Sequence, residues 1–128
     1  MKIGLITDSV GHLSFESALD VAKEHELSSV EVATGNWSEA PHANLPTLVS
    51  SADARAEFAE KISSRGLTLS AFCANGNQLH PIEGPQHDKV VRETIELASA
   101  LSVPTVVLMS GLPGAPGDST PNLSLIHI

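Results

Sequence analysis

Four short hydrophobic segments alternate with three amphipathic ones along this chain, and this order constrains the fold more than any other feature. The hydrophobic segments are rich in Val, Ile and Leu, as buried strands are, and they cover residues 2–7, 30–33, 67–73 and 105–110. Strands that are separated by helices lie parallel and are joined by right-handed crossovers. The chain is therefore expected to be an α/β protein, either an open doubly wound sheet or part of an eight-stranded barrel.

The amphipathic segments predict three helices, over residues 14–26, 53–65 and 86–101. Ser14 and Asp53 are the expected N-caps of the first two helices, because their short polar side chains can accept from a free backbone N–H. Gly66 is expected to end the second helix in the left-handed conformation. A short additional helical turn is expected near residues 45–49.

Polar and glycine-rich residues follow every strand, whereas the returns from helix to strand are short. These loops begin after the strands as Asp8-Ser9-Val10-Gly11-His12, Thr34-Gly35-Asn36-Trp37, Ala74-Asn75-Gly76-Asn77-Gln78 and Gly111-Leu112-Pro113-Gly114. Parallel α/β folds build their active sites from the loops that follow strands. Candidate functional residues are therefore expected at this one end of the sheet.

The composition excludes several classes of protein. With 7 basic and 15 acidic residues, a net charge of -8 makes nucleic acid and anionic membranes poor partners. No apolar run approaches the roughly 20 residues of a membrane span, and the N-terminus lacks the pattern of a signal peptide. The single cysteine, Cys73, cannot form an internal disulfide and suits the reducing cytoplasm. The two common nucleotide-binding fingerprints are also missing after the first strand.

Glu31 is the strongest single candidate for a functional side chain. It lies inside a strand between Val30 and Val32, so the valines face one side of the sheet and the carboxylate the other. In a barrel that other side is the interior, where a charge is costly unless it is paired or liganded. The alternative is an edge strand on which Glu31 is solvated.

Three further residues are candidates for substrate binding. His80 closes a loop with two Asn and one Gly, and a neutral His can bind metal or move protons near pH 7. Asn75 can bond a substrate hydroxyl or serve a turn, and Trp37 can wall a pocket against an apolar sugar face or cover the rim.

Other polar residues of these loops give a weaker signal. His12, His42 and Asp8 share the same end, but their spacing matches no compact metal motif. Cys73 ends a buried strand and is interpreted as a small core residue rather than a nucleophile. His87, near a helix start, is interpreted as a structural or surface residue.

Four segments together resemble the sugar phosphate isomerase/epimerases, which belong to the xylose isomerase-like TIM barrels; the segments are residues 1–9, 30–37, 75–81 and 107–114. The resemblance implies a (β/α)₈ barrel with a divalent metal at its C-terminal mouth. The metal would polarise a carbonyl and a hydroxyl while glutamates move a proton through an enediol. The substrate implied is a small sugar or sugar phosphate.

The resemblance carries over only two site residues. Glu31 matches the glutamate of the second strand, and His80 matches the histidine of the loop after the third strand. Neither is assigned as the proton-transfer base. The metal ligands of these enzymes come mainly from the second half of the barrel, so no metal ligand is expected in this chain.

A complete barrel needs about 250 residues, so the chain is expected to be the N-terminal half of a cytoplasmic isomerase or epimerase. Residues 1–122 would form the partial barrel. We hypothesise that residues 123–128 are a non-native tail, because Leu-Ser-Leu-Ile-His-Ile is one reading frame of a sequencing adaptor.

A half barrel is expected to be inactive and to self-associate through its open edges. The competing hypothesis is a complete small α/β binding or regulatory domain without catalysis. A nuclease-like barrel is the third possibility, and the acidic charge of the chain disfavours it.

Overall fold

A computed structural model of the chain describes residues 1–110. The expected tail at 123–128 and the glycine-rich loop at 111–117 lie outside the described residues. The elements along the chain are β1 (Gly4–Ile6), the 3₁₀ helix η1 (Thr7–Val10), α1 (Phe15–Glu24), β2 (Ser29–Ala33), α2 (Leu45–Ser50), α3 (Ala52–Ser63), β3 (Thr68–Cys73), α4 (Gly84–Ala100) and β4 (Val106–Val107).

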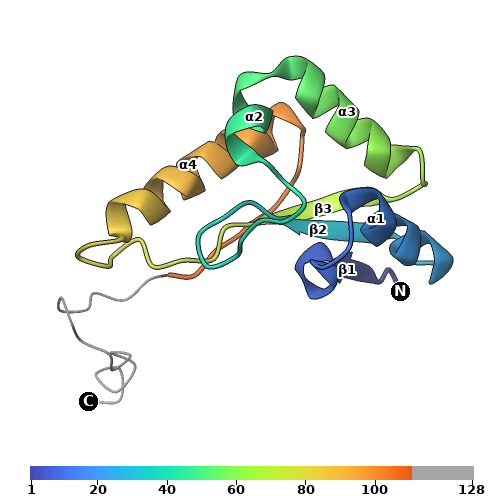
Figure 1. Cartoon of the computed structure of the whole chain (residues 1–128), viewed down its shortest axis with the longest axis horizontal. Coiled ribbons are helices and arrows are strands. Elements are labelled where there is room, and N and C mark those ends of the chain that lie inside the picture. Colours follow the sequence, from blue (N-terminus) through green and yellow to red (C-terminus); the bar gives the residue numbers. More distant parts are fainter. Residues whose placement is uncertain (111–128) are drawn as a thin grey trace, which may run out of the picture.

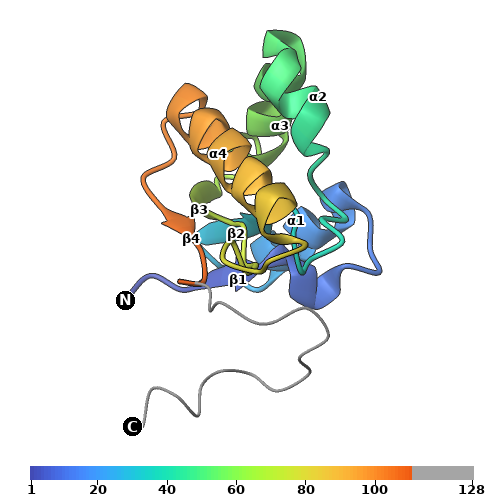
Figure 2. The ribbon, with the colours of Figure 1, turned by 90° about the vertical axis from the view of Figure 1, so that its left-hand side faces the viewer.

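The four strands form one parallel sheet in the order β1-β2-β3-β4, which is also their order along the chain. Right-handed crossovers between successive neighbours place every helix on the same face of the sheet, and Figure 1 shows the helices gathered on one side. The same arrangement is seen from the end in Figure 2. A doubly wound sheet would reverse its strand order at a switch point. The sequential order therefore selects the barrel expectation over the doubly wound one.

The register of the sheet separates a helix-facing row of side chains from a barrel-facing row. Val32 pairs with Phe72, and Phe72 with Val106, in the helix-facing row. Phe72 is fully buried there and stacks on Phe58 of α3 at 6.3 Å between ring centroids. Phe15 of α1 continues the stack, 4.9 Å from Phe58. These rings lie at the centre of the core, between the sheet and the helices.

The barrel-facing row contains Ile6, Glu31 and Ala71, which are partners across β1, β2 and β3. The register shifts between Val30 and Glu31, so that Ser70 has no partner position on β2. Its hydroxyl donates instead to the Val30 carbonyl at 3.0 Å. No helix of the described residues covers this face.

Most of the helix ends that the sequence predicted are present in the structure. The Ser14 hydroxyl accepts from the Ser17 N–H at 3.2 Å, as expected of an N-cap. Gly66 has φ +74°, and the Leu67 N–H reaches back to the Ile62 carbonyl, as in a Schellman motif. The Asp53 cap was wrong: Ser51 is extended and accepts from Ala54 N–H at 3.2 Å, which places Asp53 inside the first turn of α3.

Three elements differ from the expected pattern. The turn near residues 45–49 is a complete helix, α2, capped by Asn44 and followed directly by α3, so the described chain has four α-helices rather than three. β1 runs into η1, and β4 is limited to Val106–Val107 instead of 105–110. None of the described helices is long and apolar enough to cross a membrane.

Candidate functional site

The loops that follow β2 and β3 are joined to each other by backbone hydrogen bonds. The Trp37 N–H donates to the Asn75 carbonyl at 3.0 Å, and the Thr34 N–H donates to the Cys73 carbonyl at 2.9 Å. These bonds extend the sheet beyond the ends of both strands. The carboxyl ends of the strands therefore hold their loops in a fixed arrangement, which we call the mouth of the sheet.

Glu31 lies on the barrel-facing side of β2, as expected, and is half-buried. Its carboxylate lies close enough to the Cys73 thiol to act on it electrostatically. Burial raises the pKa of the Cys73 thiol, the neighbouring Glu31 and Asp8 carboxylates raise it further, and a backbone hydrogen bond at Asn75 acts in the opposite direction. A protonated thiol is a poor nucleophile, which fits the expectation that Cys73 is not a nucleophile. Its side chain is buried, but on the barrel-facing side of β3 rather than in the helix-facing core.

Several polar atoms around the mouth are buried and have no hydrogen-bond partner among the described residues. They are Thr7 Oγ1, Asp8 Oδ1, Asn36 Oδ1, Asn75 Oδ1 and Gln78 Nε2. A buried polar atom without a partner costs roughly 1–3 kcal/mol. These five unpartnered atoms lie at the ends of three adjacent strands. A ligand that supplied the missing donors and acceptors would remove this cost.

Asn36 and His87 hold the loop after β3 in place. The sequence indicated a structural or surface role for His87, and the role of Asn36 was missed. Asn36 has φ +64° and donates from Nδ2 to the Ala74 carbonyl at 2.9 Å. Its side chain lies directly over Gly76, where a Cβ would come within 2.9 Å of it. His87 is buried, and its Nδ1 lies 2.9 Å from the Asn77 nitrogen. The one feature of the sequence that pointed to this role of Asn36 was its place between Gly35 and Trp37.

His80 has a more local role than expected. Its Nδ1 accepts from the backbone N–H groups of Ile82 at 3.2 Å and Glu83 at 3.0 Å, just before α4. With Nδ1 engaged as an acceptor, the neutral ring carries its hydrogen on Nε2. In this form His80 can donate a hydrogen bond to a ligand from Nε2, whereas metal binding through Nε2 would require the other tautomer. Substrate binding by His80 stays a prediction.

The remaining candidates are distributed around the rim. Trp37 is 62% exposed, so its indole is accessible to a ligand. His12 is exposed. His42 is buried, stacks on Phe15 at 5.8 Å, and lies with Nε2 3.0 Å from the Leu13 carbonyl. In the described part of the chain no three His, Cys, Asp or Glu side chains come together as metal ligands, so residues 1–110 alone do not fit a metal site.

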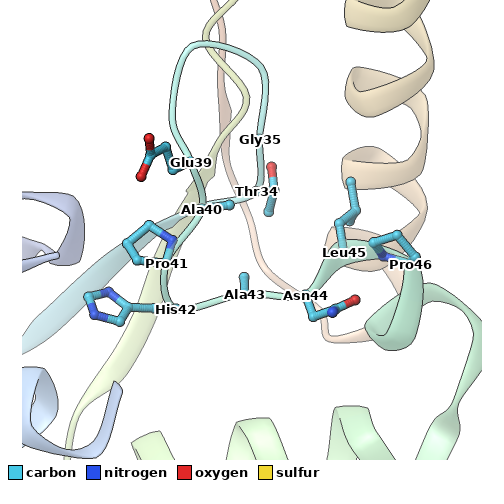
Figure 3. Close-up of a pocket in the computed structure, with 10 residues that line it drawn as sticks. All are labelled: Thr34, Gly35, Glu39, Ala40, Pro41, His42, Ala43, Asn44, Leu45 and Pro46. Carbon is cyan, nitrogen blue, oxygen red and sulfur yellow. The ribbon is translucent and has the colours of Figure 1, made fainter. Parts of the chain in front are cut away.

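An open hollow of about 580 Å³ lies beside the mouth, in the loop between β2 and α2. Figure 3 shows Thr34 and Gly35 on one side of it and Asn44, Leu45 and Pro46 on another. Its lining residues are Thr34, Gly35, Glu39, Ala40, Pro41, His42, Ala43, Asn44, Leu45 and Pro46. None of the four substrate-binding candidates lines it, so the hollow is separate from the residues that the sequence singled out.

These features define half of a TIM barrel, with a polar mouth at the carboxyl ends of its strands. The crystal structure of a xylose isomerase domain protein from Planctomyces limnophilus has this fold. It superimposes with a TM-score of 0.61 and 17% identity over 97% of this chain and 45% of its own. The expected fold class is thereby confirmed.

A closer sequence relative is an uncharacterised protein, YfiH of Bacillus subtilis (strain 168). It is 44% identical over 124 residues, which are 95% of this chain and 40% of YfiH. The chain thus spans less than half the length of either protein. No family model matches the chain.

Proposed function

We propose that this chain supplies a substrate-binding half of a barrel enzyme that isomerises or epimerises a sugar or sugar phosphate by moving a proton through an enediol. The observation that carries the proposal is the position of Glu31, a carboxylate on the barrel-facing side of β2. The loops after β1 and β3, at the same end of the sheet, contain the unpartnered oxygens of Asp8 and Asn75. Buried acceptors require hydrogen-bond donors, and the hydroxyl groups of a sugar are donors of the right kind.

Each candidate has a separate role in this proposal. Glu31 and Asn75 accept hydrogen bonds from substrate hydroxyls and thereby fix the orientation of the sugar. The exposed indole of Trp37 covers an apolar sugar face, and His80 donates from Nε2. The groups that transfer the proton belong to the remainder of a longer barrel.

The proposal includes a divalent metal in the intact barrel, held by residues outside 1–110. No three potential ligands meet within the described part of the chain, so we assign no chemical step through a metal to these residues. A cytoplasmic location is part of the same proposal, because Cys73 is a buried free thiol and a reducing compartment keeps it so.

A chimera tests the function. Residues 1–110 of this chain would replace the matching part of YfiH, to which the chain is 44% identical. Incubation with aldoses, ketoses and their phosphates in D₂O should exchange the hydrogen next to the carbonyl, which NMR detects. Glu31→Gln should weaken substrate binding by about tenfold or more, since hydrogen bonds to a charged group contribute about 1.5–3 kcal/mol.

The 128-residue chain by itself should give no exchange under the same conditions. Turnover by this chain would disprove the expected inactivity of the fragment. A folded chimera without exchange on any sugar, together with a chain that unfolds cooperatively as a monomer, would favour the non-catalytic binding domain instead.

A further inference from the structure

The mouth contains more hydrogen-bond acceptors than donors. Three of the unpartnered atoms are side-chain oxygens of Asp8, Asn36 and Asn75, and one is the amide nitrogen of Gln78. The carboxylate of Glu31 is at the same end of the sheet, near the Cys73 thiol, on which the Asp8 carboxylate also acts. The site is therefore rich in acceptors and negatively charged, a combination that favours neutral molecules with many O–H donors.

No cation of this chain lies in the loops at the mouth. The sequence has 7 Lys and Arg residues, and residues 7–14, 34–44 and 74–83 contain none of them. Lys61 of α3 and Arg65, which follows α3, bond to acids of α1, and Arg92 bonds to Asp88 on α4. The others are Lys2 before β1, Lys23 in the last turn of α1, Lys89 paired with Glu93, and Arg55 on the carbonyls of Leu48 and Val49.

The helix starts near the mouth do not replace the missing cations. A helix N-terminus can bind an anion through its free N–H groups, but here groups of the protein already accept from part of them. The side chains of Ser14, Asn44 and Ser51 each accept from one N–H at the starts of α1, α2 and α3. At the start of α4, the Gly84 N–H donates to the His80 carbonyl and the Gln86 N–H to the Glu83 carbonyl. A phosphate at the mouth would therefore meet carboxylates without a compensating side-chain cation.

We propose that the loops after β1, β2 and β3 bind an uncharged, polyhydroxylated part of the substrate and exclude a phosphate group. The proposal rests on the proposed function in taking the mouth as the substrate site. It narrows the substrate class: at this half of the mouth the ligand is a neutral sugar or polyol. Repulsion from Asp8 and Glu31 disfavours a phosphate dianion.

Titration of the 128-residue chain with glucose and with glucose 6-phosphate tests the proposal by two-dimensional amide NMR. Glucose should shift the amides of residues 7–8, 31 and 75–78, and glucose 6-phosphate should bind these residues more weakly. Gln78→Lys should raise the affinity for glucose 6-phosphate relative to glucose by about tenfold, because it adds a charge-assisted hydrogen bond. Gln86→Lys, on the exposed start of α4, is the control and should leave the ratio unchanged.

Tighter binding of glucose 6-phosphate by the unaltered chain would overturn the proposal, and so would the absence of shifts with either sugar. An unchanged ratio in Gln78→Lys, with a native amide spectrum, would also count against it. Exchange in the YfiH chimera tests the enzyme class separately. If exchange fails while the preference for glucose holds, only the proposed function is disproved. If a sugar phosphate is the better substrate and binds this half, only the present inference is disproved.

Discussion

The hydroxyl groups of Thr34 and Thr94 lie 2.8 Å apart in the core, between the end of β2 and the middle of α4. Thr94 Oγ1 also lies 2.7 Å from the Val90 carbonyl, so each hydroxyl has a carbonyl acceptor besides its partner and either one can be the donor of the pair. Thr34 Oγ1 also lies 3.2 Å from the Cys73 carbonyl. This buried polar contact connects two strand ends to the helix that covers them.

Thr94→Val should lower the free energy of unfolding by about 1 kcal/mol, near the low end for a lost buried hydrogen bond. The cost is limited because Thr34 can donate to the Cys73 carbonyl instead. Urea denaturation measures the change. Thr105→Val, an equivalent change at an exposed residue, should be almost neutral, and an equal loss in both variants would contradict the assignment.

Glu26 and Ser102 end α1 and α4 with φ of 56° and 55°, in the left-handed region that L residues rarely adopt. Replacing either with Gly should stabilise the fold by about 0.5–1 kcal/mol, since Gly adopts this conformation without steric cost. Glu24→Gly, inside the last turn of α1, should instead destabilise by a similar amount. Thermal denaturation measures these changes. The argument would be refuted if Glu24→Gly and the Gly variants at Glu26 and Ser102 changed the stability in the same direction.

Two ion pairs join α1 to α3 and to the turn that follows α3, and they predict an acid-sensitive stability. Lys61 lowers the pKa of Glu16, and Arg65 lowers the pKa of Asp20, in each case mainly through a direct hydrogen bond. A lowered folded pKa stabilises the fold above the ordinary values of 4.5 and 3.8, and the contribution disappears as the pH falls through the folded values.

The prediction is checked by measuring unfolding between neutral pH and about pH 3, the range in which carboxylates titrate. A Glu16→Gln, Asp20→Asn double variant should lose part of the stability at neutral pH and show a flatter acid dependence. Salt should reduce the difference, because both pairs are exposed to solvent. A double variant with the same acid profile as the parent would exclude these pairs as its cause.

Gly76 is expected to tolerate no side chain. A Cβ there would lie 2.9 Å from both Cβ and Nδ2 of Asn36, and overpacking of this kind costs about 1–3 kcal/mol. Gly76→Ala should therefore destabilise the fold and shift the amides of the loop after β3. Adding Asn36→Gly, which removes the clash at a residue with φ +64°, should recover part of the loss; no recovery would indicate another cause.

The open barrel-facing side of the sheet predicts self-association of the chain. Ile6 is 41% exposed on this side and β1 has an unpaired edge among the described strands. Sedimentation velocity should detect concentration-dependent association that Ile6→Asp weakens. Ile95→Asp on α4, where the side chain is 51% exposed, is the matched control and should leave association unchanged.

The strands were predictable because hydrophobic runs and their spacing depend on local sequence. These runs left an open sheet and a barrel both possible, and only the family resemblance of four segments favoured the barrel. Gly66 was also predictable from local sequence. The cap of α3 was not, since Ser51 and Asp53 are both good N-caps and the choice depends on how α2 and α3 meet. The roles of His80 and His87 depend on the path of the loop between them, which no local pattern determines.

Ser70 sets the phase of β3. It is the residue without a partner position on β2, and beyond it the alternation of side chains along β3 is reversed. If Ser70 occupied a regular paired position instead, Phe72 would point to the barrel-facing side and Cys73 toward the helices. The division of β3 between core and barrel interior is therefore a question of parity, decided by whether the number of paired residues between Leu69 and Phe72 is odd or even.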